Sequence, residues 1–416
     1  PPRSTLFPYT TLFRSSSGFA QWDMCMKLDV IFAADALRPP LTGIGRYTYE
    51  LARRVRCHED IERLRYFSSG RWVSDPLGAM ETSDHVSISL NRKKAALRDR
   101  LAGSRIAVRV YERLAPAIFE WRLRGNEKSV YHSPNYIVPP FKGRTVSTVH
   151  DLSHIICPQF HPRARVEYMN MALGDSLART NHVITVSETV RQEVLAHGLM
   201  PPEQVTAIHL AAGSDFFPHS SKMLEPAMTA LGLRAGEYSL FVGTVEPRKN
   251  VERLVQAYGM LPERMRSDWP LVIAGARGWN SDSIHACIEK AQAQGWARYI
   301  SYVDQSWLPA LYAGARLMAY PSLYEGFGLP IVEALASGTP VLTSRVSCMP
   351  EVAGGAAWLV DPLDLEEISH GLEVCLADER WQEQARALGL ARSAQFSWEK
   401  CAERTVGIYA RVAQLV

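Results

Sequence analysis

Short apolar runs alternate with amphipathic stretches along the chain from residue 27 onward. The pattern predicts a buried strand at residues 27–36 ("KLDVIFAADA") and an amphipathic helix at residues 45–55 ("GRYTYELARRV"). Further β-rich runs of the first half lie at residues 129–133, 144–151, 182–187 and 204–210. The second half repeats the theme at residues 238–243, 270–275, 298–303, 316–322, 339–344 and 356–360. The runs are apolar throughout, which is typical of parallel strands covered on both faces, so we predict an α/β fold with two doubly wound domains.

The length of the chain agrees with two domains, because 416 residues exceed what one ordinary core accommodates. Residues 213–238 contain Pro, Gly and Ser but no strand pattern. We therefore expect a first domain at 26–215, a linker at 216–237 and a second domain at 238–396. The amphipathic segment 397–416 comes after the last strand and has a good N-cap in Ser397, so it is free to pack elsewhere.

Residues 1–25 do not fit the start of a domain. They begin without Met and lack a long apolar run, and no strand or helix pattern connects them to the strand predicted from residue 27. We expect a non-native or disordered leader here, with a signal peptide as the competing interpretation.

The composition of the chain bears on its partners and its cellular location. The 46 basic and 43 acidic side chains nearly balance, so the overall charge points to no nucleic-acid partner. No apolar run approaches the ~18 residues that a membrane-spanning helix needs. The seven cysteines form no CxxC pair, which favours a reducing, cytoplasmic location.

The most distinctive stretch, residues 321–338 ("PSLYEGFGLPIVEALASG"), runs from the end of a predicted strand through a glycine loop into a helix. Glu325 lies in the loop and Glu333 in the first turns of the helix, with Pro330 suited to its start. In open α/β sheets ligands bind beyond the carboxyl ends of the strands, and glycines leave backbone N–H groups accessible. The helix dipole alone explains an acid at Glu333 but not one at Glu325, so we predict a ligand site here.

A second strand–loop–helix stretch, residues 240–258 ("LFVGTVEPRKNVERLVQAY"), places two cations before a helix. Arg248 and Lys249 precede Asn250, which we expect to be the N-cap of that helix. Arg binds phosphate oxygens in a bidentate way and Lys acts as a point charge, so the pair suits a diphosphate.

Two weaker motifs lie in the first half. Gly43 and Gly45 open a helix, but the third glycine of a dinucleotide fingerprint would fall at Thr48, so NAD binding is not supported; nor is a P-loop, because no GxxxxGK[ST] occurs. His150 and Asp151 lie together at the end of a predicted strand. That pair suits either a structural or a functional role.

Taken together, "EGFGLPIVEA", "GTVEPRKN", "TGIGRYTYEL", "VHDLSH" and "ITVSE" resemble the retaining glycosyltransferases of the GT-B fold, family GT4. Within that family the chain is most similar to bacterial mannosyl- and rhamnosyltransferases of O-antigen and capsule assembly, from about Met26 to the C-terminus. The resemblance implies two Rossmann-like domains facing a central cleft, a C-terminal helix that crosses back to the first domain, and a nucleotide-sugar donor.

The resemblance also implies roles for single residues. Glu333 would bind the donor ribose, Glu325 would face the transferred sugar, and His150 would contact that sugar near its 6-position. The residues expected to bind the donor are Gly43, Gly45, Asp151, Ser187, Thr244, Arg248, Lys249, Glu325, Gly326, Phe327, Gly328, Leu329 and Glu333. The residues expected to be catalytic are Glu325, His150, Lys249 and Arg248. Thr244 stands where many relatives carry an Arg, so the diphosphate would depend more heavily on Arg248 and Lys249.

Several activities remain open on these residues. Two carboxylates ~5–9 Å apart also suit a glycosidase, but a hydrolase has no use for cations placed for a diphosphate. No Asp-x-Asp occurs, so we expect no metal and no other cofactor. We predict a metal-independent hexosyltransferase using GDP-mannose and a saccharide or lipid-linked saccharide acceptor. The alternatives are a UDP-sugar donor, a nucleotide-sugar epimerase, a phosphorylase, for which no pyridoxal lysine is supported, and a non-catalytic sugar-nucleotide-binding module.

Residues 92–124 carry ten basic and three acidic side chains with apolar residues interleaved. Such a helix can lie on an anionic membrane surface, which would place the protein on the inner face of the plasma membrane. The competing interpretation is a solvated helix whose apolar side packs on the first sheet.

Overall fold

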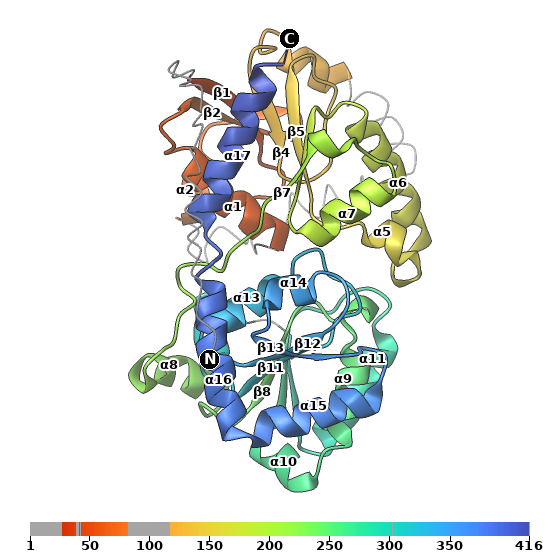
Figure 1. The fold of residues 1–416 in the computed structure, drawn as a ribbon, viewed down its shortest axis with the longest axis vertical. Helices are drawn as coiled ribbons and strands as arrows, with labels where there is room; N and C mark the ends of the chain where they lie inside the picture. Colours follow the sequence, from red (N-terminus) through yellow and green to blue (C-terminus); the bar gives the residue numbers. More distant parts are fainter. Residues whose placement is uncertain (1–26, 39–40, 42, 82–116, 302, 416) are drawn as a thin grey trace, which may run out of the picture.

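The computed structural model describes residues 27–38, 41, 43–81, 117–301 and 303–415, which form two α/β domains stacked along the long axis of the molecule (Figure 1). The predicted leader 1–25 and most of the basic segment 92–124 lie outside the described residues.

In the described part of the first domain, the sheet has the order β3-β2-β1-β4-β5-β6-β7 and is parallel except for the β2–β3 hairpin. Its strands are β1 Leu28–Ala33, β2 Ile61–Ser68, β3 Arg71–Val73, β4 Val130–Ser133, β5 Arg144–Val149, β6 His182–Thr185 and β7 Val205–Ala207. The helical segments are α1 Gly43–Val55, α2 Gly78–Glu81, α5 Ser153–Ile156, η1 Pro158–Phe160, α6 Arg163–Leu177, α7 Glu188–Ala196 and η2 Pro202–Gln204.

Strands β2 and β3 were not predicted, for a physical reason. Strand β2 is only partly buried and carries Arg63 and Arg65 among its apolar residues. Both guanidinium groups pair with Asp29 on β1, Arg63 at 2.6 Å and Arg65 at 3.1 Å. A strand near the sheet edge that is stabilised by ion pairs lacks the continuous apolar run that identifies its neighbours.

The described second sheet is parallel throughout, with the order β10-β9-β8-β11-β12-β13. Its strands are β8 Ser239–Val242, β9 Leu271–Ala274, β10 Ala297–Ile300, β11 Leu317–Tyr320, β12 Val341–Ser344 and β13 Ala357–Val360. The helical segments are α8 Ser221–Leu231, η3 Pro247–Lys249, α9 Val251–Gly259, α10 Glu263–Asp268, α11 Asp282–Ala293, α12 Leu308–Ala313, α13 Leu329–Ala336, α14 Met349–Ala353, α15 Leu365–Ala377 and α16 Glu379–Ser393. Helices α9, α11 and α15 pack together on one side of the sheet, with α13 and α16 on the other (Figure 1).

Both sheets have a topological switch point, where the strand order reverses. In the first sheet it lies between β1 and β4, and in the second between β8 and β11. Ligands of doubly wound sheets bind in the crevice beyond the carboxyl ends of such strands. The two strongest motifs come directly after β8 and β11, so the fold places them together at the crevice of the second domain.

Two segments connect the domains. Helix α8 lies inside the segment predicted as a linker, and it buries Leu224 and Met228 while packing against α12 of the second domain. The C-terminal helix α17, Trp398–Ala413, returns to the first domain and packs on α1 and on the first sheet (Figure 1). Ser397 caps it as predicted, and Glu399 pairs with Arg54 of α1 at 2.7 Å. The predicted crossing back is therefore confirmed.

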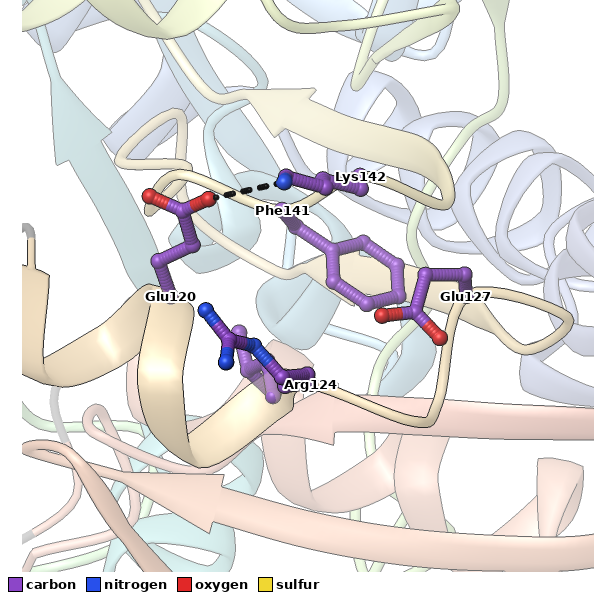
Figure 2. A pocket seen from close by; sticks show the side chains of 6 residues that line it. Glu120, Arg124, Glu127, Phe141 and Lys142 are labelled. Atoms are coloured by element: carbon purple, nitrogen blue, oxygen red, sulfur yellow. Dashed lines mark ion pairs between the residues drawn. The ribbon is translucent and has the colours of Figure 1, made fainter.

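The described end of the basic segment lies on the first domain. Residues 117–123 are helical and bury Leu123, while Trp121 is 63% exposed. Beside this helix is a small cavity of about 50 Å³, where Glu120 pairs with Lys142 at 3.4 Å (Figure 2). A cavity of this size holds little more than a few waters, and its charges are of both signs, so it is no candidate for a nucleotide-sugar site.

No helix in the described ranges combines the length and apolar content that a membrane span requires.

Candidate active site

The two motif loops of the second domain are bound to each other. The backbone N–H of Leu323 donates to the carbonyl of Arg248 at 2.9 Å. The buried side-chain amide of Asn250 donates to the carbonyls of Pro321 at 2.9 Å and Pro362 at 2.7 Å. Asn250 occupies the N-cap position of α9 as predicted, with φ +60°, but its side chain makes no capping hydrogen bond. Its amide instead fixes the cation loop against the glutamate loop.

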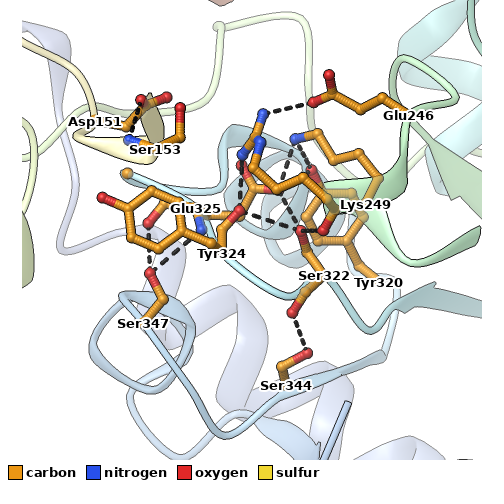
Figure 3. A network of polar contacts seen from close by, with 12 residues as sticks. Asp151, Ser153, Glu246, Lys249, Tyr320, Ser322, Tyr324, Glu325, Ser344 and Ser347 are labelled. Atoms are coloured by element: carbon orange, nitrogen blue, oxygen red, sulfur yellow. Dashed lines mark hydrogen bonds and ion pairs between the residues drawn. The ribbon is translucent and has the colours of Figure 1, made fainter. Parts of the chain in front are cut away.

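Glu325 is enclosed by groups of its own domain (Figure 3). One carboxylate oxygen, Oε1, accepts from Lys249 Nζ at 2.6 Å. The hydroxyls of Ser322 and Tyr320 donate to the same oxygen at 2.7 and 2.9 Å. The other oxygen lies 3.2 Å from Arg248 Nη1. Burial alone would raise the pKa of Glu325, but the Lys249 and Arg248 charges outweigh it and lower the pKa to about 2. The carboxylate is therefore held as an anion.

Arg248 is paired in turn with a second carboxylate. Its Nη2 donates to Glu246 at 2.8 Å, and Nη1 donates to the carbonyl of Tyr324 at 2.7 Å. Arg248 Nε is buried and has no hydrogen-bond partner among the described residues. A buried donor without a partner is costly in a folded protein, so this N–H is a natural contact for an anionic ligand.

Glu333, eight residues along the chain, has a different environment. It is as buried as Glu325, yet it forms no ion pair with a cation of the described residues, and the groups that act on its carboxylate are the Tyr312 hydroxyl, the Arg46 guanidinium and Asp215. Burial raises the pKa of Glu333, and the Arg46 guanidinium and the nearby Tyr312 hydroxyl oppose that rise. Arg46 comes from α1 of the first domain and lies 3.9 Å from Asp215.

The first domain presents His150 and Asp151 to the same cleft. His150 Nε2 donates to the carbonyl of Pro134 at 2.7 Å, which leaves Nδ1 as the acceptor of a neutral ring. Burial lowers the pKa of His150. Burial would raise the pKa of Asp151, but the Arg248 charge and contacts with Ser153 outweigh it and lower the pKa. Both side chains thus lie next to the cation loop across the domain boundary.

The glycine loop touches the first domain so closely that one position excludes any side chain. A Cβ on Gly326 would lie 1.8 Å from the carbonyl oxygen of His150. Ser187 Oγ donates to the carbonyl of Gly326 at 2.7 Å, and Gly43 faces Leu329 across the cleft, its Cβ position 4.0 Å from Leu329 Cδ1. These predicted residues of the two domains are therefore brought together.

Other predicted residues serve the fold around the site. Gly45 packs under the β1–α1 turn, where a Cβ would lie 2.9 Å from the carbonyl of Ala36. Gly328, at φ +85°, starts α13. The Phe327 ring is buried against His209 and Phe396, at centroid distances of 6.0 and 5.7 Å, in the segments that join the domains. Thr244 is exposed and lies against Gly278.

Sequence reasoning missed several residues that shape the site. Tyr320 ends β11 and Ser322 lies two residues beyond it, and both hydroxyls donate to Glu325. Ser347, at φ +55°, donates to the carbonyl of Glu325 at 2.7 Å from a loop that is remote in the sequence. Tyr320 and Ser322 lie in the strand predicted at residues 316–322, where polar residues near a strand end were a usable signal, whereas Ser347 and Arg46 depend on tertiary structure.

Comparisons with known proteins agree with this architecture. Residues 233–391 match the family model described as "Glycosyl transferases group 1". The chain is 39% identical over 382 residues to O-antigen chain mannosyltransferase B of Escherichia coli, covering 92% of this chain and 99% of that protein.

Two solved structures share the fold at low sequence identity. Sucrose-phosphate synthase from Thermosynechococcus elongatus has a TM-score of 0.68 and 19% identity, covering 93% of this chain and 99% of that one. Anabaena Alr3699/HepE in complex with UDP-glucose has a TM-score of 0.65 and 14% identity, covering 92% and 100%. At these identities the likeness establishes the fold alone, and it confirms the predicted GT-B architecture.

Proposed function

Because the chain belongs to the group 1 glycosyltransferases, we propose that it transfers mannose from GDP-mannose to a saccharide or lipid-linked saccharide acceptor, with retention of configuration and without a metal ion. The choice of mannose is supported by the relative that is 39% identical over nearly the whole of both chains. Retention is proposed from the resemblance to family GT4.

The observation that carries the proposal is the contrast between Glu325 and Glu333. A nucleotide sugar needs one end bound by its ribose, its diphosphate neutralised and its anomeric carbon left accessible. Glu333 is buried and has no ion pair with a cation of the described residues, and with only the Tyr312 hydroxyl acting on it from its own domain its carboxylate has acceptor capacity for the ribose hydroxyls. Lys249 and the unpartnered Arg248 Nε suit the diphosphate, and Glu325 and His150 suit the sugar.

The transfer step separates a sugar cation from a diphosphate anion. Charges fixed in a dry site stabilise such a transition state more than water does, because they need no reorganisation. In this proposal the diphosphate gains negative charge as the bond to the sugar breaks, and the Arg248 and Lys249 cations stabilise that charge. Glu325 stays ionised beside the sugar. We propose that these two cations do the work that a divalent metal does in other transferases.

A donor screen tests the proposal. With purified full-length protein, GDP-mannose should release nucleotide faster than UDP-glucose does, and a glycoside acceptor should raise that release far above the slow hydrolysis of the donor alone. Addition of EDTA should leave the rate unchanged. Preference for a UDP-sugar, or inhibition by EDTA that Mg²⁺ or Mn²⁺ relieves, would overturn those parts of the proposal. An epimerase would convert the donor without acceptor, and a binding module would give no turnover at all.

The contact with a membrane surface remains part of the proposal, in a cytoplasmic protein whose acceptor is lipid-linked. What supports it is the basic segment 92–124, together with Trp121 and Ile118, which are exposed at its described end. The wild type should sediment with anionic vesicles at low salt, and it should be released at high salt. Replacing Arg92, Lys93, Lys94 and Arg98 by Glu should abolish sedimentation. A wild type that stays in the supernatant at low salt would favour a soluble acceptor.

A further inference from the structure

A cavity of about 370 Å³ lies beside the donor site, between the two domains. It is lined by Tyr136, His161, Arg165 and Tyr168 of the first domain and by Arg248 and Trp279 of the second. Its volume is within the range of small-molecule sites, ~300–1,000 Å³. His150 and Asp151 also line it, so the cavity opens where the donor sugar is expected.

Trp279 is inserted into the first domain from the loop between β9 and α11. Its indole Nε1–H donates to the carbonyl of Phe160 at 2.7 Å. The Arg165 guanidinium lies 4.4 Å from the centre of its ring, and the His161 ring lies at 5.6 Å. A cation over an indole face is an attractive contact that strengthens when water is excluded. Trp279 therefore lines the cavity from the second domain, together with Arg248, and joins that domain to the first.

The lining combines aromatic surface with polar groups that have capacity for a ligand. His161 Nε2 lies 2.9 Å from Ser153 Oγ, whereas its Nδ1 is buried and has no hydrogen-bond partner among the described residues. Tyr136 and Tyr168 add aromatic faces, and Asp151 and Arg165 add charges of both signs. This mixture suits a sugar ring, which has apolar C–H faces and hydroxyls at its rim.

We propose that this cavity holds the terminal sugar of the acceptor and that Trp279 is a positioning residue that completes it from the donor domain. The inference rests on the proposed function. Because Trp279 reaches the cavity only when the two domains meet as they do in this structure, the acceptor binds well in that arrangement and poorly in an open one. Trp279 then governs acceptor affinity without contacting the donor.

The test uses full-length Trp279→Ala and Trp279→Phe, with Trp307→Ala as the matched control. Trp307 is a partly exposed tryptophan of the same domain, just before α12 and outside the cavity lining. The acceptor is the octyl glycoside that the wild type uses best in a panel of hexosides. Three quantities are measured for each variant: the KM for this acceptor, the rate of GDP-mannose hydrolysis without acceptor, and the Kd of GDP by calorimetry. Thermal unfolding checks that each variant is folded.

Trp279→Ala should raise the acceptor KM tenfold or more while hydrolysis and the GDP Kd stay within twofold of wild type. Trp279→Phe should recover part of the loss, because it keeps an aromatic ring but not the indole N–H, and Trp307→Ala should resemble wild type. An unchanged acceptor KM, or an equal loss in GDP affinity, would overturn the inference, as would a wild type that hydrolyses donor but uses no hexoside. A wild type that neither hydrolyses nor binds the donor would instead overturn the proposed function.

Discussion

The two ends of the segment 325–333 carry the same side chain in opposite surroundings. At one end, Glu325 is saturated by Lys249, Arg248 and two hydroxyls, and its pKa is lowered to about 2. At the other end, Glu333 is equally buried but forms no ion pair with a cation of the described residues, and burial raises its pKa against the opposing Arg46 and Tyr312. Burying an acid without a cation in direct contact is costly, so a protein that keeps one there is expected to gain from it through a ligand.

The two environments suit two different roles, one in the transition state and one in ground-state binding. A charge that is fixed before the substrate arrives contributes to the transition state without reorganisation, which is the situation of Glu325. A carboxylate with free acceptor positions contributes to ground-state binding, which is the situation of Glu333. Substitutions at the two glutamates and at their neighbours can strengthen or break this distinction.

The largest effect is expected from Glu325→Gln on turnover. Removing the fixed charge beside the sugar should slow transfer by about 10²–10³-fold, the size of a lost preorganised electrostatic group. Steady-state kinetics with saturating donor measures it. Glu246→Gln is the matched control, because Glu246 also pairs with Arg248 but is not hydrogen-bonded to Glu325. It should cost less than tenfold, and near-wild-type turnover of Glu325→Gln would remove Glu325 from catalysis.

The pH dependence of stability should have opposite signs at the two glutamates. Because the pKa of Glu325 falls from 4.5 to about 2 on folding, its ionisation stabilises the fold above pH 4.5, by about 3 kcal/mol, and that contribution is lost as the pH falls toward 2. The pKa of Glu333 is raised, so its burial destabilises the fold at high pH, and the penalty falls as the pH drops from the folded pKa toward the unfolded value of 4.5.

Urea unfolding of wild type, Glu325→Gln and Glu333→Gln between pH 7 and about pH 2.5 measures both effects. The stability difference between wild type and Glu325→Gln should shrink as the pH falls. For Glu333→Gln the variant should be the more stable protein at pH 7, and its advantage should shrink. The same sign for both variants would contradict the contrast.

Two buried tyrosines offer a smaller, matched comparison. Tyr320 donates to Glu325 and accepts from Lys249, whereas Tyr312 neighbours Glu333 with no hydrogen bond of ordinary geometry to its hydroxyl among the described residues. Tyr320→Phe should lower the free energy of unfolding by about 1–2 kcal/mol. Tyr312→Phe should be neutral or slightly stabilising, and urea unfolding at pH 7 compares the two. An equal loss for both would show that Glu333 is partnered after all.

Much of this arrangement could be predicted from the sequence, because the signals are local. Parallel strands covered on both faces read as apolar runs, and all the predicted strands of the second domain are present. The glutamates and cations stand at the ends of β11 and β8, where topology alone brings them together. The glycines of the loop are local signals too: Gly326 stands where the first domain approaches the loop closely, and Gly328 where the backbone has a positive φ.

The rest depends on contacts between distant segments. Strand β2 was missed because ion pairs with Asp29 replace apolar residues on it. Asn250 occupies the N-cap position that its local pattern predicts. However, its Oδ1 accepts from Arg253 and its NH2 group donates to the carbonyls of Pro321 and Pro362, so the side chain does not cap the helix. Arg46 and Trp279 each interact with the other domain, and the residue spacing within their own helix or loop does not predict those interactions.

The most direct test of the central claim is the affinity of GDP for wild type, Glu325→Gln and Glu333→Gln, measured by calorimetry at pH 7. Glu333→Gln should bind GDP more weakly by about 1–3 kcal/mol, because it loses charged hydrogen bonds to the ribose. Glu325→Gln should bind GDP as tightly as wild type or more tightly, since Lys249 and Arg248 lose a competing carboxylate. Weaker binding by Glu325→Gln together with unchanged binding by Glu333→Gln would contradict the account.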